Sequence, residues 1–263
     1  MDIIQNISIL GGQDKNRRLE LVDRIDLKMG DMVSVVGPTG SGKTTLINDI
    51  ELFADRNTPS GRRILINGEV PSPDYTENPA SNPIALITQH TTFLSDLPVI
   101  EFLTIHARVR NNFRPEAGDL VRQTLDFANQ LTGEPINETS RMMELSGGQT
   151  RALLIADAAV ICNTPIILLD EVENAGIYRV RTLELLREYR KIFLFVTHDP
   201  RITLLSDYRI VMQNGSIVKV IHTTEEERSL ALKVSQIDDV LTAMREKIRL
   251  GEVLVDADLE GLL

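Results

Sequence analysis

This chain has a single cysteine, no long apolar run and no excess of positive charge. Cys162 is the only cysteine, so no internal disulfide can form, and its apolar neighbours indicate a small buried residue. No apolar run approaches the ~20 residues that span a bilayer. The longest candidate, 152–161, is interrupted by Asp157. Residues 1–5 contain no basic segment and no apolar core, so we expect no signal peptide.

Acidic residues outnumber basic ones. Lys and Arg total 28 against 38 Asp and Glu, which gives a net charge of −10. A nucleic-acid partner needs a clustered basic surface, so this balance argues against one. Apolar residues make up 42% and charged residues 25%, ordinary values for a soluble globular protein with a large core. We therefore expect a cytoplasmic protein, either free or peripheral on the inner face of the cell membrane.

The apolar pattern predicts an α/β fold with one helical insertion. Unbroken apolar runs such as 166–169 and 192–196 suit a parallel sheet covered on both faces. From 91 to 146 the pattern is helical, which predicts a helical subdomain between strands of the core. Strands are expected at 3–10, 18–27, 32–36, 62–66, 84–88, 166–169, 192–196, 208–212 and 217–221, helices at 44–53, 152–161 and 178–189, and a proline-rich loop at 70–83.

The C-terminal part of the chain is predicted to form a separate helix. Thr224 and Glu227 have capping-box spacing. Apolar residues then follow at steps of four and three, a heptad seam about two and a half repeats long. The seam consists of Leu230, Val234, Ile237, Leu241, Met244 and Ile248. It either packs on its own or a neighbouring domain or pairs with a second copy of the chain.

Residues 37–44 have the pattern of a phosphate-binding loop. They read Gly-Pro-Thr-Gly-Ser-Gly-Lys-Thr, after an apolar strand and before a helix. Gly40 and Gly42 let several backbone N–H groups face one phosphate chain, and the following helix adds its positive end. Lys43 can reach the β- and γ-phosphates, and Thr44 can place its hydroxyl on Mg²⁺. The predicted nucleotide-binding residues here are Gly37, Pro38, Thr39, Gly40, Ser41, Gly42, Lys43, Thr44 and Thr45.

The apolar strand at 166–169 ends in two carboxylates, Asp170 and Glu171. The Asp170 carboxylate can point at the shell of Mg²⁺, and Glu171 can polarise an attacking water as a general base. Two acids at such a position can also cap the next helix. The phosphate-binding loop earlier in the chain favours the catalytic interpretation.

With three further motifs, the chain resembles the ATP-binding cassette (ABC) ATPases over residues 1 to about 221. Gln89 stands where that family has its Q-loop glutamine, residues 145–149 read Leu-Ser-Gly-Gly-Gln like its signature, and His198 stands in the switch-histidine segment 196–200. The resemblance implies a P-loop NTPase fold with a mainly parallel core sheet, an N-terminal antiparallel β subdomain and an inserted helical subdomain at about 91–146. Residues 222–263 then form a C-terminal helical extension.

The resemblance also implies a mechanism. Two cassettes, as a homodimer or a heterodimer, sandwich ATP between the P-loop of one and the signature of the other. The signature residues that cover the nucleotide are Ser146, Gly147, Gly148 and Gln149. The implied catalytic residues are Glu171, His198 and Gln89, and the implied Mg²⁺ ligands are Thr44, Gln89 and Asp170.

Two segments depart from the family's pattern. Leu10 stands where an aromatic residue usually stacks on adenine, and no Tyr or Phe precedes Phe53, so base stacking is weaker or replaced. After the strand that ends in Asp170, which resembles the family's Walker B motif, Asn174 and Ile177 stand where Ser and Asp are common in the family's D-loop, a segment that crosses the dimer interface. Glu173, between these departures, is either a second acid near the site or an exposed acid at a helix start.

Three functions are compatible with these motifs. The first is the energising subunit of a membrane transporter with separate permease subunits. The second is a soluble ABC ATPase that drives a conformational change in a partner protein, and the third is a nucleotide-gated dimer with little turnover, against which Glu171 argues. Fold analogy favours the transporter. The apolar residues that follow Gln89 either receive a coupling helix of the permease or form subdomain core: Phe93, Leu94, Leu97, Val99 and Phe102.

Overall fold

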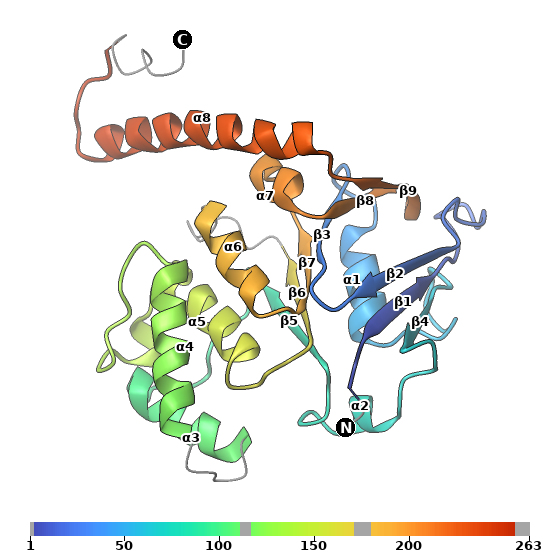
Figure 1. Ribbon diagram of the computed structural model, residues 1–263, viewed down its shortest axis with the longest axis horizontal. Coiled ribbons are helices and arrows are strands. Elements are labelled where there is room, and N and C mark those ends of the chain that lie inside the picture. Colours follow the sequence, from blue (N-terminus) through green and yellow to red (C-terminus); the bar gives the residue numbers. More distant parts are fainter. Residues whose placement is uncertain (1–2, 111–116, 171–179, 256–263) are drawn as a thin grey trace.

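Two β-sheets organise the chain. The computed structural model describes residues 3–110, 117–170 and 180–255. The smaller sheet is antiparallel in the order β2-β1-β4, and the larger has the order β5-β6-β7-β3-β8-β9, in which only β8 and β9 are antiparallel neighbours (Figure 1). The strands are β1 (Asn6–Leu10), β2 (Arg24–Lys28), β3 (Met32–Val36), β4 (Arg63–Ile66), β5 (Ile84–Thr88), β6 (Ile166–Asp170), β7 (Ile192–Val196), β8 (Tyr208–Gln213) and β9 (Ser216–His222). This arrangement confirms the predicted α/β fold with a mainly parallel core sheet.

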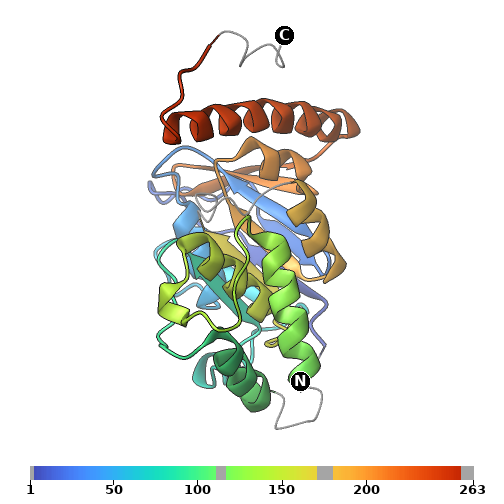
Figure 2. The same ribbon diagram turned by 90° about the vertical axis from the view of Figure 1, so that its left-hand side faces the viewer.

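Helices cover the large sheet. Figures 1 and 2 show α3, α4 and α5 grouped on the side of the large sheet away from the small one. In the sequence, α3 and α4 lie between β5 and β6, where the helical segment was predicted. The helices are α1 (Lys43–Glu51), α2 (Asp74–Glu77), α3 (Val99–Arg110), α4 (Ala117–Leu131), the 3₁₀ turn η1 (Met142–Glu144), α5 (Gly147–Ala159), α6 (Val180–Glu188), α7 (Pro200–Leu205) and α8 (Glu225–Arg249).

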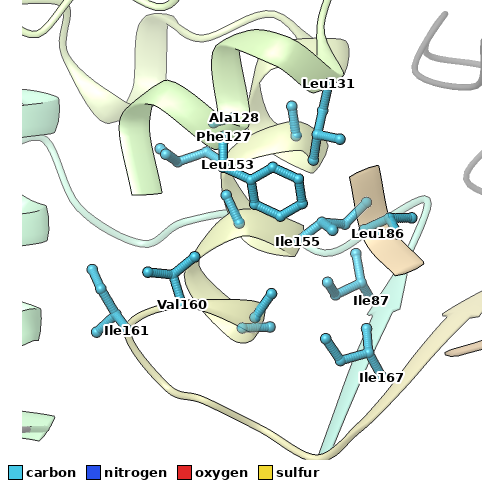
Figure 3. Close-up of a cluster of buried hydrophobic side chains, with 14 of the residues drawn as sticks. Ile87, Phe127, Ala128, Leu131, Leu153, Ile155, Val160, Ile161, Ile167 and Leu186 are labelled. Carbon is cyan, nitrogen blue, oxygen red and sulfur yellow. The ribbon is translucent and has the colours of Figure 1, made fainter. Parts of the chain in front are cut away.

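The large sheet is buried on both faces. Along β6, Ile166 and Leu168 join a core shared with α1 and the small sheet, whereas Ile167 and Leu169 join a core shared with α3, α4 and α5. All four side chains are 0% exposed, as expected for a parallel strand covered on both sides. Figure 3 shows part of the second core, where side chains of α4 and α5 lie over Ile167.

The N-terminal strands are shorter than predicted. β1 begins at Asn6 rather than Ile3, and β2 covers 24–28 rather than 18–27. Leu19 and Leu21 are 87% and 80% exposed, whereas Glu20 between them is 8% exposed. Glu20 turns inward because its carboxylate pairs with a buried arginine, so its two apolar neighbours point outward.

Two helical segments also differ from expectation. The proline-rich loop predicted at 70–83 contains the short α2. Helix α5 begins at Gly147 rather than Ala152 because the hydroxyl of Ser146 accepts a hydrogen bond from the N–H of Gln149 (3.3 Å) and caps the first turn. The signature segment therefore lies at a helix N-terminus.

Helix α8 packs against α7 at one edge of the molecule (Figure 1). The predicted capping box is present, since Thr224 and Glu227 each accept a hydrogen bond from the backbone N–H of the other (3.2 Å). Ala231 is fully buried, yet most of the apolar seam is exposed: Leu230, Ile237, Leu241 and Ile248 are 40–60% exposed. Pairing of this seam with a second copy stays a prediction. Within the described residues, no helix combines the length and the apolar character that a membrane span requires.

Candidate nucleotide-binding site

Four neighbouring strands of the large sheet end at one edge. Thr88 of β5 lies beside Asp170 of β6, and Asp170 lies beside Val196 of β7. Val196 in turn lies beside Val35 of β3. Because these strands are parallel, the segments that follow them leave the sheet at the same edge, where ligands of open α/β sheets bind.

The predicted motifs follow these strands. The loop 37–42 leaves β3 and leads into α1, Gln89 follows β5, and His198 follows β7. Asp170 is the partly buried last residue of β6. The structure thus brings the P-loop, Gln89, Asp170 and His198 to one edge. Glu171 and the D-loop departures at 173–177 lie outside the described residues.

The P-loop backbone requires glycine at two positions, where it packs on the end of β8 and on the β8–β9 turn. Gly37 has φ 153° and Gly42 has φ 100°. A Cβ at Gly37 would lie 2.3 Å from the carbonyl oxygen of Met212, and a Cβ at Gly42 would lie 2.9 Å from the Cα of Gly215. The close packing of this loop therefore depends on bare backbone.

The loop presents unused hydrogen-bond donors beside a buried cation. The Nζ of Lys43 donates to the carbonyls of Gly37 (2.9 Å) and Pro38 (3.4 Å), and this lysine is 6% exposed. Gly42 precedes α1 without a side-chain cap, and the first N–H groups of a helix have no acceptor within it. The Ser41 hydroxyl is buried with no hydrogen-bond partner in the described part of the chain. These donors fit a phosphate chain.

A buried ion cluster supports the loop from behind. The guanidinium of Arg62 is 0% exposed and donates to Glu20 (Oε1, 2.5 Å), to Asp49 of α1 (Oδ2, 2.9 Å) and to the carbonyl of Gly215 (2.7 Å). Glu20 also accepts from the N–H of Ile217 (2.6 Å). One side chain thus joins the segment before β2, the helix after the P-loop and the β8–β9 turn. No local sequence pattern marks these residues.

A cavity of about 580 Å³ opens beside the P-loop. Among the residues that the structure describes, no aromatic side chain lines this cavity, and Leu10 of β1 does not line it either. Two cationic side chains line the cavity, Lys15 and Arg17. The Nζ of Lys15 donates to the carbonyl of Gly40 (2.7 Å). The lining residues are Gln13, Asp14, Lys15, Arg17, Gly42, Thr45, Thr58, Pro59, Ser60 and Gly215.

The Q-loop and switch positions are held mainly through their backbones. The carbonyl of exposed Gln89 accepts from the guanidinium of Arg151 in α5 (3.3 Å), which ties the Q-loop to the helix that carries the signature. After β7, the Thr197 hydroxyl accepts from the N–H of Asp199 (2.8 Å), and Asp199 caps α7. His198 between them is exposed.

The signature segment forms a capping box. The N–H of Ser146 donates to the Gln149 side chain (2.9 Å), and the amide nitrogen of that side chain donates to the carbonyl of Pro135 (3.1 Å). Ser146 and Gly147 are exposed. None of the residues 145–149 lines the cavity beside the P-loop.

The apolar residues after Gln89 divide between core and surface. Val99 is 0% exposed and belongs to the core, whereas Leu94 is 99% exposed. Phe93 and Phe102 are partly buried against that core, with their rings edge to face at 5.2 Å. The expectation that these apolar residues share one role, either docking of a coupling helix or subdomain core, is therefore wrong.

A glycine-rich loop between a central parallel strand and a helix, with a strand-end carboxylate at the same edge, defines a P-loop nucleotide-binding protein. Residues 23–174 match the ABC transporter family. The chain therefore belongs to the ABC transporter family, a family of ATP-binding proteins, and the resemblance seen in its motifs is confirmed.

Similar proteins agree with this assignment. An uncharacterised ABC transporter ATP-binding protein of Methanocaldococcus jannaschii is 48% identical over 256 residues, 97% of each chain. A sulfate/thiosulfate import ATP-binding protein of Rhizobium meliloti is 34% identical, and the match covers 76% of this chain but 58% of that protein. The fold is similar to a dimeric ATP-binding cassette in a post-hydrolysis state bound to ADP and Pi, with a TM-score of 0.61 at 21% identity over 83% of this chain and 99% of that one.

Proposed function

We propose that this chain hydrolyses ATP as one half of a cassette dimer and powers a membrane transporter through separate permease subunits. The observation that carries this proposal is the meeting of the P-loop, Gln89, Asp170 and His198 at one sheet edge, while the signature lies on another helix. Relatives named for sulfate/thiosulfate import and for lipid A-core flipping support the transport role.

The phosphates of ATP fit the donors of the P-loop. Lys43 exchanges its carbonyl contacts for the β- and γ-phosphates, and the N–H groups at the start of α1 hold the same chain. Thr44, Asp170 and Gln89 would hold Mg²⁺. When bound, Mg²⁺ neutralises charge on the phosphates.

The purine fits the cavity beside the loop. A cation over the face of an aromatic ring is attracted by the ring's quadrupole, so Lys15 or Arg17 can take the place of the missing aromatic residue. A cation at this place accounts for a base site in which Leu10 of β1 supplies no stacking aromatic ring. The contact between this cation and the purine would be additional to the phosphate contacts of the proposed ATP site, which stay unchanged.

The second cassette completes the site. Ser146, Gly147 and Gly148 present a hydroxyl and backbone N–H groups at the positive end of α5, which suits the γ-phosphate held by another copy. Both polar ends of the Gln149 side chain are engaged within the chain, so we assign it the task of positioning the signature rather than contacting nucleotide.

Hydrolysis is assigned to three side chains. Glu171, directly after Asp170, takes the proton of the attacking water, and His198 with Gln89 orients that water and the γ-phosphate. We place the ATPase domain at 1–221 and assign 91–146 to contact with the permease on the inner face of the membrane. Residues 222–263 form the C-terminal extension.

Dimer formation tests the proposal most directly. In saturating Mg-ATP, the Glu171→Gln protein should accumulate as a dimer by light scattering, because the bound charge is no longer removed. Its hydrolysis should fall by at least about 100-fold. The double variant Glu171→Gln with Lys43→Ala, which lacks the phosphate contact, should stay monomeric.

A monomeric Glu171→Gln protein, alone and with its natural partners, would contradict the dimer mechanism. Purification from its own cells in detergent separates the two partner classes. Isolation with a multi-span membrane protein supports the transporter, whereas isolation with a soluble enzyme alone favours the soluble ABC ATPase.

A further inference from the structure

Three metal-ligating side chains meet at the far end of α5 from the signature. Asp157 lies in the last turn of α5, Cys162 follows that helix, and His106 belongs to α3. One donor atom from each lies within 4.8 Å of the other two. The helix rises about 1.5 Å per residue, so its 13 residues put the cluster about 20 Å from the signature end.

The distances within the cluster approach those of a tetrahedral site. The Sγ of Cys162 lies 4.0 Å from the Nε2 of His106 and 3.6 Å from the Oδ2 of Asp157. In a tetrahedral zinc site, bonds of about 2.3 Å to sulfur and about 2.0 Å to nitrogen place two donor atoms about 3.5 Å apart. Each of the two distances to the thiol therefore exceeds the distance expected in a zinc site by about half an ångström or less, and a bound cation must draw the three donor atoms together from within 4.8 Å.

The surrounding hydrogen bonds hold the cluster in place. The Nδ1 of His106 lies 2.9 Å from the Oδ1 of Asp157, so the imidazole and the carboxylate are already in contact, and a cation bound by both would replace this hydrogen bond. The N–H of Cys162 donates to the carbonyl of Asp157 (2.9 Å), which fixes the thiol beside the carboxylate. A cavity of about 120 Å³ borders Cys162 and offers room for a water ligand.

One neighbour opposes a bound cation. The Nε of Arg110 donates to the Nε2 of His106 (3.4 Å), and its guanidinium also donates to the carbonyl of Ala80 (3.3 Å). Arg110 is exposed, so its side chain can turn toward water. Burial, and next the charge of Asp157, raise the pKa of the Cys162 thiol to about 12, so a bound cation must replace the thiol proton, which passes to water.

We propose that Cys162, His106 and Asp157 bind a divalent cation of the zinc class, with water as a further ligand. A thiolate, an imidazole and a carboxylate form a mixed set that suits a borderline-soft ion and differs from the all-oxygen shell of Mg²⁺. The cation would join α3 to α5 outside the nucleotide site. This proposal is independent of the proposed ATPase function.

Titration of the metal-free full-length protein with Co²⁺ tests the site. Because Cys162 is the only cysteine, a thiolate-to-cobalt absorption band can arise from no other residue. We expect a band that saturates in proportion to protein and disappears when Zn²⁺ is added. Cys162→Ser should lose the band, His106→Ala should weaken Co²⁺ binding by more than about 10-fold, and Arg110→Gln should strengthen it.

His222→Ala, at an exposed position of β9, is the matched control and should leave the titration unchanged. Absence of a thiolate band in the wild-type protein at saturating Co²⁺ overturns the proposal. A thiolate-to-cobalt band that stays unchanged in His106→Ala also overturns the proposal. ATP affinity measured with and without Zn²⁺ should be the same, so failure of this site and failure of the ATP site are separate results.

Discussion

The P-loop and the signature segment are held in different ways. Behind the P-loop, Arg62 joins two carboxylates and a turn without contact with water. At the signature, Ser146 and Gln149 are joined by hydrogen bonds at the surface. The P-loop is thus fixed before any ligand arrives, whereas the signature presents its donors outward. This difference agrees with the proposed dimer, in which the P-loop is complete within one chain and the signature contacts nucleotide held by a second copy.

The largest expected effect follows from removal of the buried cation. Arg62→Met leaves the carboxylates of Glu20 and Asp49 buried without their partner, which should lower the free energy of unfolding by about 3–5 kcal/mol. Arg24→Met removes an exposed ion pair with Asp26, which solvent screens, and should change the free energy of unfolding little. Urea unfolding compares the two. Equal losses of unfolding free energy in the two variants would contradict the conclusion that the buried ion cluster of Arg62 fixes the P-loop.

Loss of the P-loop lysine should act on binding rather than folding. Lys43→Ala removes a charged donor to the phosphates, and such bonds contribute about 1.5–3 kcal/mol, or about 10-fold to 100-fold in affinity. A fluorescent ATP analogue measures this loss. Lys191→Ala removes another buried lysine, whose Nζ donates to the carbonyl of Asn163 (3.1 Å), and should leave affinity unchanged. Intact binding in Lys43→Ala would discredit the P-loop assignment.

Substitution in the signature should have a small effect on folding. Ser146→Ala removes the cap of α5 and should cost about 1 kcal/mol of unfolding free energy. Its ATP affinity as a monomer should stay at the wild-type value, while dimer formation in the Glu171→Gln background weakens. Thr224→Ala removes a similar cap from α8 and should leave dimer formation intact. A loss of ATP affinity in the monomeric Ser146→Ala protein would show that the P-loop and the signature contact the nucleotide within one chain.

Strands with continuous apolar character were predicted to within a residue. β3, β6 and β7 follow the pattern because they are buried on both faces, so every position carries the same signal. The motifs at their ends are local in sequence, and the parallel register brings them together. Family membership and the mainly parallel sheet could therefore be obtained from the sequence alone.

Contacts between polar residues that are distant in the sequence could not be predicted from the sequence alone. Arg62 pairs with Glu20 and Asp49 across long stretches of chain, and the polar character of all three predicts a surface position. The same holds for His106 of α3, whose Nε2 lies 4.0 Å from the Sγ of Cys162 beyond the end of α5. Leu19 and Leu21 show the reverse error, because the inward turn of Glu20 leaves both exposed. Periodicity reports which face of an element is buried, and it carries no signal for such pairings.

The buried guanidinium also constrains how this protein can evolve. A relative that has lost Arg62 while keeping Glu20 and Asp49 should be rare, because two carboxylates would then share a dry interior. A set of three apolar residues of similar volume could replace the charged trio as a unit. These three positions are therefore expected to covary, and their joint variation in an alignment would record the coupling of α1 to the β8–β9 turn.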